Sequence, residues 1–356
     1  MKESKYPLWE GRKNLPRAGG GRTVFMLLAT VVLSALTAKG LGGLFCIGIA
    51  GAFFGALLTT VRRPVIWLAV PVSFGGAYLL SGDLLLSLSV LLFVPVGFIL
   101  AYALFFEKSF SVSVVCLTVV LLASMGLMVL VSVTEAYEGT VRQAAGAFLG
   151  DIESYFREAF ASVSYPMADG QTYSLPAETV DRLIETAVMI LPAVAVVTCE
   201  LLAYVIAKLF RAIVIRSGFR FMLGDRSGEV TVSVGASVVY LISAAVSFFV
   251  TKASVIAYSA VNITYIFLPA MAIVGFKMLF GRRGFFRSRR QGPGRIMMIV
   301  AVAFLIFMSP IGFLQMLAVL AAVYTVGRTL ISGIDHGHGG EDDGGSEDKG
   351  DNEGQH

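Results

Sequence analysis

Long and nearly unbroken apolar runs dominate the chain, and short polar stretches separate them. Apolar positions in these runs do not alternate with polar ones, as they would in barrel strands, so the pattern favours helices. A bilayer core about 30 Å thick requires roughly 20 apolar residues in a helix. The predicted spans are 23–38, 41–60, 65–80, 84–106, 110–134, 186–210, 231–250, 253–280 and the long final run 296–331.

The final run, Ile296–Ile331, is too long for one span, since a helix of that length measures about 54 Å. The sequence Ser309-Pro310-Ile311-Gly312 lies in its middle and predicts a turn. We therefore expect two short spans here and about ten in all. Nine spans result if Pro310 only kinks one tilted helix, and eight is the lower alternative. The predicted fold class is all-α, a polytopic transmembrane helix bundle.

Composition supports a membrane protein, because 56% of the residues are hydrophobic and only 15% are charged. Soluble domains have about 25% charged residues. The composition excludes a soluble enzyme, a disordered protein and a nucleic-acid-binding module as the main interpretation. No phosphate loop, zinc-protease helix or nucleophile elbow is present. The three His residues all lie near the C-terminus, which removes the commonest general base. We predict no enzymatic activity, no cofactor, no metal site and no nucleic-acid partner.

The basic residues are distributed unequally between the two sides of the predicted bundle. With the N-terminus inside, 23 of the 28 Lys and Arg residues fall on the inner side and 5 on the outer side. This bias indicates a cytoplasmic N-terminus and C-terminus. Segment 1–22 is then a basic cytoplasmic segment, and the acidic, Gly-rich tail 332–356 is predicted to be disordered. Two membrane regions, 23–134 with five spans and 186–331, flank segment 135–185.

Segment 135–185 is the one long connection and carries nine acids and three Arg residues, as expected on the outer side. Apolar residues recur in it at helical spacing, which predicts an amphipathic helix on the outer surface. This helix could pack as a lid on the bundle or gate a site that opens outward. A second helix is expected to start near Pro176 and to continue into the sixth span. The apolar positions of the amphipathic helix are Val141, Ala145, Phe148, Leu149, Ile152, Phe156, Phe160 and Val163.

Glu200 is the only acid well inside a predicted span. Burying a carboxylate in a membrane is costly unless it is paired or protonated, so such a residue is a functional candidate. Tyr204, Lys208 and Arg211 follow on the same helical face. The stripe indicates either a proton or cation site, or a wall of a substrate pocket. The alternative is an interhelical hydrogen bond, with Lys208 extending to the inner surface.

Two further polar stripes lie on the seventh and eighth spans. Ser237 and Tyr240 belong to a serine-rich face of the seventh span, and Tyr258 and Asn262 are four residues apart on the eighth. Facing polar stripes could line a solute cavity. Alternatively, serine-rich faces are close-packing seams whose hydroxyls bond to carbonyls one turn earlier.

The second span contains small residues at four-residue steps, including the GxxxG pair Gly51 and Gly55. Small residues let helix backbones approach closely, within one chain or between partners. We therefore predict Gly48, Gly51, Ala52 and Gly55 as a helix-packing or partner face.

Three motifs make the chain resemble the uncharacterised bacterial YybS-like membrane proteins over residues 23–330. The first runs from Leu191-Pro192 through Glu200-Leu-Leu-Ala-Tyr204 to Leu209-Phe-Arg211, and the second is Asn262-Ile-Thr-Tyr-Ile-Phe-Leu with Gly275 and the arginine-rich loop. The third is the closing hairpin from Pro310 to Gly327. The family is distantly similar to the substrate-capturing subunits of energy-coupling-factor transporters. The resemblance implies a bacterial plasma-membrane location and a transporter partner.

Two functions from different classes follow from these features. The first is binding or transport of a small solute, for which the small-residue hairpin would be the docking face for a partner. The second is a non-catalytic membrane scaffold or regulatory protein that contacts other envelope proteins. The lipid bilayer is a partner in both.

Overall fold

The computed structural model describes most of the apolar part of the chain. The described residues are 19–39, 43–61, 64–137, 140–161, 164–166, 172–174, 176–217, 230–250, 254–280 and 309–337. Most of the basic segment 1–22, the arginine-rich loop, residues 296–308 of the final run and most of the tail lie outside them.

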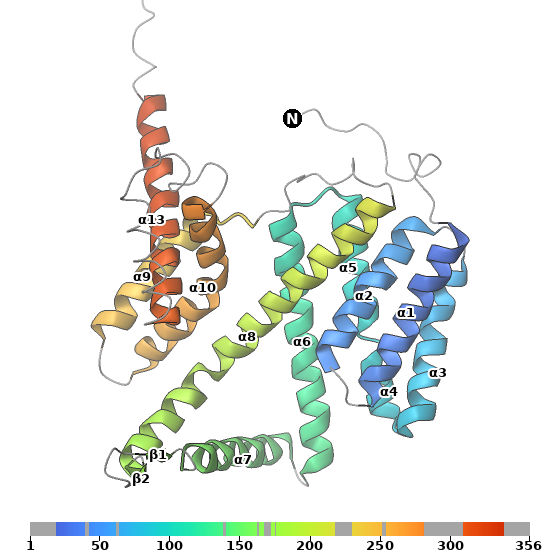
Figure 1. The fold of residues 1–356 in the computed structure, drawn as a ribbon, viewed down its shortest axis with the longest axis horizontal. Coiled ribbons are helices and arrows are strands. Elements are labelled where there is room, and N and C mark those ends of the chain that lie inside the picture. Colours follow the sequence, from blue (N-terminus) through green and yellow to red (C-terminus); the bar gives the residue numbers. More distant parts are fainter. Residues whose placement is uncertain are drawn as a thin grey trace, which may run out of the picture. The chain divides into compact units, whose positions relative to one another are not determined.

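The fold class predicted from the sequence is confirmed, because the described residues form an all-α structure with eight helical segments long and apolar enough to cross a membrane. Two of these segments, Pro64–Ser81 and Leu84–Phe105, each consist of two consecutive helices. One short antiparallel hairpin accompanies them, β1 (Ser164–Pro166) with β2 (Thr172–Ser174). Figure 1 shows the helices in chain order. Their bounds are α1 Gly20–Ala38, α2 Gly43–Thr60, α3 Ala69–Ser81, α4 Leu84–Val90, α5 Phe93–Phe105, α6 Phe110–Ala136, α7 Val141–Ala161, α8 Ala177–Arg216, α9 Val234–Phe249, α10 Val255–Phe280 and α13 Pro310–Gly337, and a 3₁₀ helix, Pro64–Leu68, precedes α3.

The chain divides into two compact units. The first comprises Met1–Val230 with Ser254–Ile266, and the second comprises Thr231–Ala253 with Phe267–His356. This division differs from the predicted regions 23–134 and 186–331, because α8 packs against α2 and α6 of the first unit. Helix α10 passes from the first unit to the second.

Helix α2 is the centre of the first unit. It is apolar on all sides, which is typical of a fully enclosed helix, and it packs against α1, α5 and α8. Phe54 of α2 is completely buried and meets the ring of Phe93 edge to face at 5.1 Å. The core is therefore built around this second helix.

Local sequence signals explain several helix boundaries. Gly82 ends α3 with a φ of +70°, which glycine adopts without strain. Asp83 then caps α4, since its Oδ1 accepts the backbone N–H of Leu85 at 2.7 Å. The predicted span 84–106 is two helices, because Pro95 has no N–H to donate to the Leu91 carbonyl, which accepts from Val94 at 2.9 Å instead.

The amphipathic helix predicted in segment 135–185 is α7. Ala144 is buried, and Phe148, Ile152, Phe156 and Phe160 follow it at four-residue steps and are half-buried. Its neighbours are α6 and α8, and Figure 1 shows it lying crosswise between the ends of these two helices. The second predicted helix is α8, which follows Pro176 and runs without interruption to Arg216. The hypothesis that α7 packs on the bundle agrees with these contacts.

The final apolar run does not continue as one helix through Pro310. Ser309 precedes α13 as a cap, with its Oγ accepting the N–H of Gly312 at 3.2 Å. Pro310 therefore starts a helix rather than kinking one. α13 also continues to Gly337, beyond the predicted start of the tail at residue 332.

Candidate functional site

Helix α8 carries the main polar candidates of the first unit, and Pro192 lies inside this continuous helix. A proline inside a helix removes one backbone hydrogen bond and crowds the preceding turn. In a regular helix the N–H of Ala193 would bond to the carbonyl of Met189. Helix α10 contacts α8 at this N–H and this carbonyl.

Asn262 of α10 holds both backbone groups beside Pro192. Its Oδ1 accepts the N–H of Ala193 at 3.1 Å, and its Nδ2 donates to the Met189 carbonyl at 3.1 Å. The second Nδ2 proton goes to the Tyr258 carbonyl of its own helix at 2.9 Å. Side-chain insertion into the helical hydrogen-bond ladder is a recognised cause of kinks. We call this arrangement of Pro192, Ala193, Met189 and Asn262 the proline clasp.

Tyr258 makes a second link between α10 and α8, one turn before Asn262. Its hydroxyl donates to Oε1 of Glu185 at 3.1 Å. Tyr258 and Asn262, which the sequence offers as candidates for lining a solute cavity or for helix packing, are thus brought together and bond to α8. Both Nδ2 protons of the Asn262 amide are engaged, so its donors are not available to a solute in this arrangement.

Glu200 lies two turns after Pro192 on α8 and is half-buried. It has no hydrogen bond or ion pair to another residue in the part of the chain that the structure describes. A carboxylate at this depth is costly as an unpaired anion. Glu200 is therefore the candidate residue that most needs a proton, a cation or a polar ligand.

The residues of the polar stripe that follows Glu200 all contact the ring of Phe110. The buried ring of Phe110, at the start of α6, meets the Tyr204 ring edge to face at 5.7 Å. Lys208 Nζ lies 5.0 Å and Arg211 Cζ 5.2 Å from the centroid of the Phe110 ring. Cation–π contacts of this kind contribute about 0.5–2 kcal/mol each, depending on exposure. Tyr204 thus belongs to an aromatic and basic cluster at one end of α8.

Ser237 and Tyr240 belong to the second unit. Ser237 is buried and its hydroxyl donates to the Ser233 carbonyl one turn earlier at 3.1 Å. Tyr240 is only 1% exposed, and α9 packs against α13. This part of the serine-rich face has the geometry of a packing seam.

The small-residue face of α2 packs within the chain. Gly48, Gly51, Ala52 and Gly55 are all buried. A Cβ at Gly55 would lie 2.9 Å from the Gly97 carbonyl oxygen of α5, and one at Gly48 would collide with Ile206 of α8. None of the four residues is exposed to a partner.

The sequence singled out Pro192 only as part of a family motif, and it did not single out Glu185 or Phe110. A proline inside the predicted sixth span was a visible signal that backbone groups there would need a partner. Nothing in the sequence indicated that Phe110 would lie beside Tyr204.

The architecture defines a multi-pass helical membrane protein. Comparisons of the chain with protein-family models, with curated proteins and with solved structures found no match.

Proposed function

We propose that this membrane protein binds and moves a small solute or cation, with Glu200 as the binding carboxylate. The observation that carries the proposal is the absence of any polar partner for the half-buried Glu200 among the described residues, on a long helix that contains Pro192. Intramembrane acids of this kind mark ion and proton pathways.

The proline clasp gives α8 a place to bend. Two interhelical hydrogen bonds from Asn262 engage the Ala193 N–H and the Met189 carbonyl, the two groups that a regular helix joins directly. Hydrogen bonds of this kind contribute only about 0.6 kcal/mol on average in membranes. Exchanging these interhelical bonds for a backbone bond within α8 should therefore require little free energy. Such an exchange would allow the two halves of α8, one of which carries Glu200, to change their angle.

The second candidate function is a membrane scaffold or regulatory protein without a substrate. The engaged donors of Asn262 and the buried hydroxyl of Ser237 favour it, because both candidate cavity residues bond to backbone carbonyls. The two functions differ in what they require of Glu200. A scaffold requires only that its carboxylate be tolerated.

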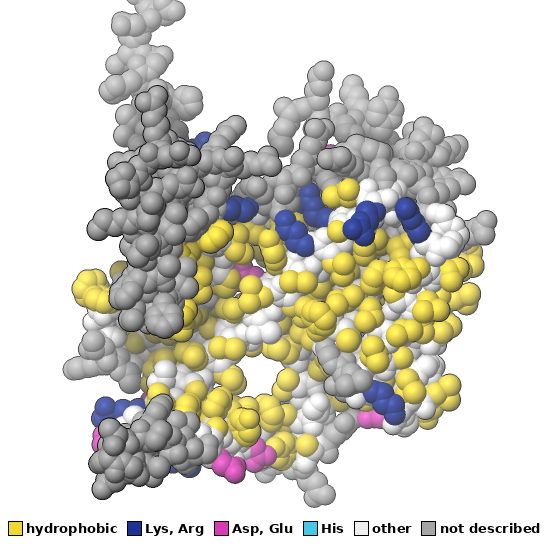
Figure 2. Space-filling model, in the orientation of Figure 1, with side chains coloured by type: hydrophobic (Ala, Val, Ile, Leu, Met, Phe, Trp, Pro, Cys, Tyr) yellow, Lys and Arg dark blue, Asp and Glu magenta, His cyan; other side chains and the backbone are white. Residues whose placement is uncertain are grey.

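The proposed location is the bacterial plasma membrane with the N-terminus in the cytoplasm. Arg22, near the start of α1, bonds to the Arg216 carbonyl, so the start of α1 and the end of α8 lie at the same end of the first unit. Figure 2 shows a row of Lys and Arg side chains at that end, whereas both acidic and basic side chains lie near α7. The positive-inside rule then assigns the arginine end to the cytoplasm. Membership of the YybS-like family and a transporter partner belong to the same proposal.

Thermal unfolding of the purified full-length protein tests the role of Glu200. Pools of water-soluble metabolites, and sodium or potassium chloride, are added to the wild type, to Glu200→Gln and to the control Glu153→Gln. Glu153 lies on the exposed face of α7. A ligand at one hundred times its Kd stabilises the folded state by about 2.7 kcal/mol.

We expect at least one pool or salt to raise the unfolding temperature of the wild type and of Glu153→Gln, but not that of Glu200→Gln. The proposal fails if nothing raises it for the wild type, or if Glu200→Gln responds equally. Either result would favour the scaffold.

A further inference from the structure

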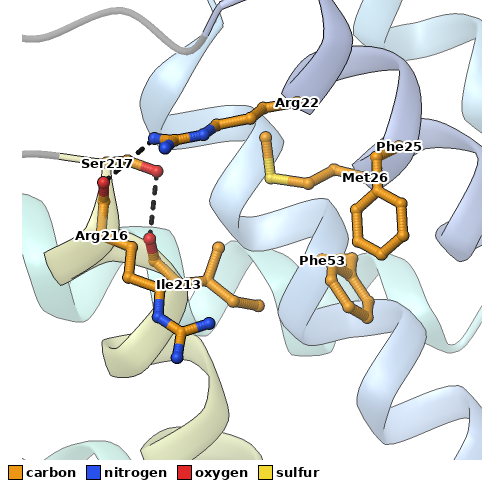
Figure 3. A pocket seen from close by; sticks show the side chains of 7 residues that line it. All are labelled: Arg22, Phe25, Met26, Phe53, Ile213, Arg216 and Ser217. Carbon is orange, nitrogen blue, oxygen red and sulfur yellow. Dashed lines mark hydrogen bonds between the residues drawn. The ribbon is translucent and has the colours of Figure 1, made fainter.

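A pocket opens in the first unit where α1, α2 and the end of α8 meet. Its volume is about 270 Å³, close to the lower end of the range for ligand pockets, about 300 Å³. It lies far along α8 from the proline clasp. Figure 3 shows the residues that line it, which are Arg22, Phe25, Met26, Phe53, Ile213, Arg216 and Ser217.

The rim of the pocket is basic. Arg22 and Arg216 are both exposed. Arg22 Nη1 donates to the Arg216 carbonyl at 3.1 Å, and this is the one hydrogen bond of the Arg22 side chain among the described residues. A guanidinium has five N–H donors, so most of those on Arg22 remain available to an anion. The first turn of α1 adds the positive end of a helix dipole at the same place.

One wall of the pocket, beside this basic rim, is apolar. The rings of Phe25 and Phe53 meet edge to face at 5.9 Å, and Met26 is buried beside them. In Figure 3 these three side chains lie together, apart from the guanidinium of Arg22. The pocket therefore combines cationic donors with an apolar wall, as an amphiphilic anion requires.

An exposed apolar row leads away from the pocket along α1. It begins at Phe25, which is 63% exposed, and continues through Leu28, Val32 and Leu36, which are also exposed and follow at helical spacing. In a membrane this row faces the acyl chains of lipid. The charged rim and the apolar row thus match the two ends of one phospholipid molecule.

We propose that the pocket binds the headgroup of an anionic phospholipid. Arg22 and Arg216 contact the phosphate, and one acyl chain follows the exposed row of α1. Arginine recognises phosphate through several N–H donors at fixed geometry, and basic pockets between membrane helices bind anionic headgroups. The site is independent of Glu200 and of the function proposed above.

Native mass spectrometry of the full-length protein in detergent tests this site. Dioleoyl phosphatidylglycerol and dioleoyl phosphatidylcholine are added separately, and retained lipid is counted. The variants are Arg22→Gln, Arg216→Gln, their combination, and the control Arg142→Gln, which removes an exposed arginine from α7.

We expect one phosphatidylglycerol to be retained in preference to phosphatidylcholine. Each pocket variant should weaken retention about fivefold and the combination about 25-fold, from the typical contribution of one basic residue near an anionic surface. Arg142→Gln should leave retention unchanged. The double variant Arg22→Lys with Arg216→Lys keeps both charges and should retain more lipid than the double Gln variant.

The proposal is overturned if both lipids are retained equally, or if the double Gln variant retains phosphatidylglycerol as the wild type does. It is also overturned if millimolar inorganic phosphate displaces the lipid completely, because the site would then recognise a free anion. Unchanged unfolding temperatures of the variants would show that lost retention is not lost folding.

Discussion

The proline clasp predicts that Asn262 and Pro192 are energetically coupled. Asn262→Leu keeps the approximate size of the side chain but leaves the Ala193 N–H and the Met189 carbonyl without their partner. At about 0.6 kcal/mol for each interhelical hydrogen bond in a membrane, two lost bonds destabilise the fold by about 1.2 kcal/mol. The largest measured values for such bonds, near 1.7 kcal/mol, set an upper limit of about 3.4 kcal/mol.

Restoring the backbone ladder should remove most of this cost. Pro192→Ala supplies an N–H at residue 192 and relieves the crowding of the preceding turn, so α8 can close its regular hydrogen bonds. In that background Asn262→Leu removes a side chain that α8 no longer needs. The coupling free energy between the two substitutions should therefore be about 1 kcal/mol.

A double-mutant cycle measures this coupling. The free energy of unfolding is obtained for the full chain in mixed micelles by titration with a denaturing detergent, for the wild type, both single variants and the double variant. Thr264→Val is the control for Asn262→Leu, because the buried Thr264 hydroxyl donates only to the Ala260 carbonyl of its own helix, at 2.8 Å. A coupling below about 0.5 kcal/mol is within the scatter of additive, independent sites and would refute the clasp.

Three further predictions test packing, the outer connection and orientation. Gly55→Leu should destabilise the fold by about 1–3 kcal/mol through overpacking against backbone, whereas Gly126→Leu, with open space around it, should be nearly neutral by chemical denaturation. The Tyr137 hydroxyl donates to Asp151, and this hydrogen bond raises the pKa of Tyr137 above its ordinary value of 10.0. The bond therefore stabilises the fold below about pH 10, and this stabilisation is lost as the pH rises through the higher pKa of the folded state. Between about pH 9 and 12 the unfolding temperature should therefore fall less for Tyr137→Phe than for the wild type. In a background without native cysteines, a membrane-impermeant maleimide added to intact cells should label Tyr137→Cys and not Ser217→Cys, and the reverse pattern would contradict the proposed orientation.

The positions of most helices could be predicted from the sequence because apolar runs alone determine them. The start of α6 at Phe110 and the continuous course of α8 from Ala177 follow from such runs and from the residues before them. Helix α7 was predictable for a different reason, since its apolar positions recur at helical spacing between charged ones. These features depend on residues close together in the chain.

The partners of the polar residues could not be predicted, because they depend on which helices are neighbours. Asn262 and Ala193 are 69 residues apart, and no local pattern connects them. The small-residue motif of α2 was compatible with an internal or an external partner. The structure shows that Gly55 meets Gly97 of α5, a residue with no distinguishing sequence context.

The length of a polar side chain explains why the predicted stripes had different outcomes. A serine hydroxyl such as that of Ser237 is short and reaches the carbonyl of its own preceding turn, so it needs nothing from a neighbouring helix. The Asn262 amide reaches across to α8 and finds backbone groups there because Pro192 interrupts the ladder. The presence of Asn262 in one span and of Pro192 in another can therefore be understood once the two helices are known to be neighbours. Glu200 differs from both, because no hydrogen bond or ion pair among the described residues involves its carboxylate. An unpaired carboxylate in a membrane destabilises the fold by several kcal/mol, and this is the reason for proposing that Glu200 binds a ligand.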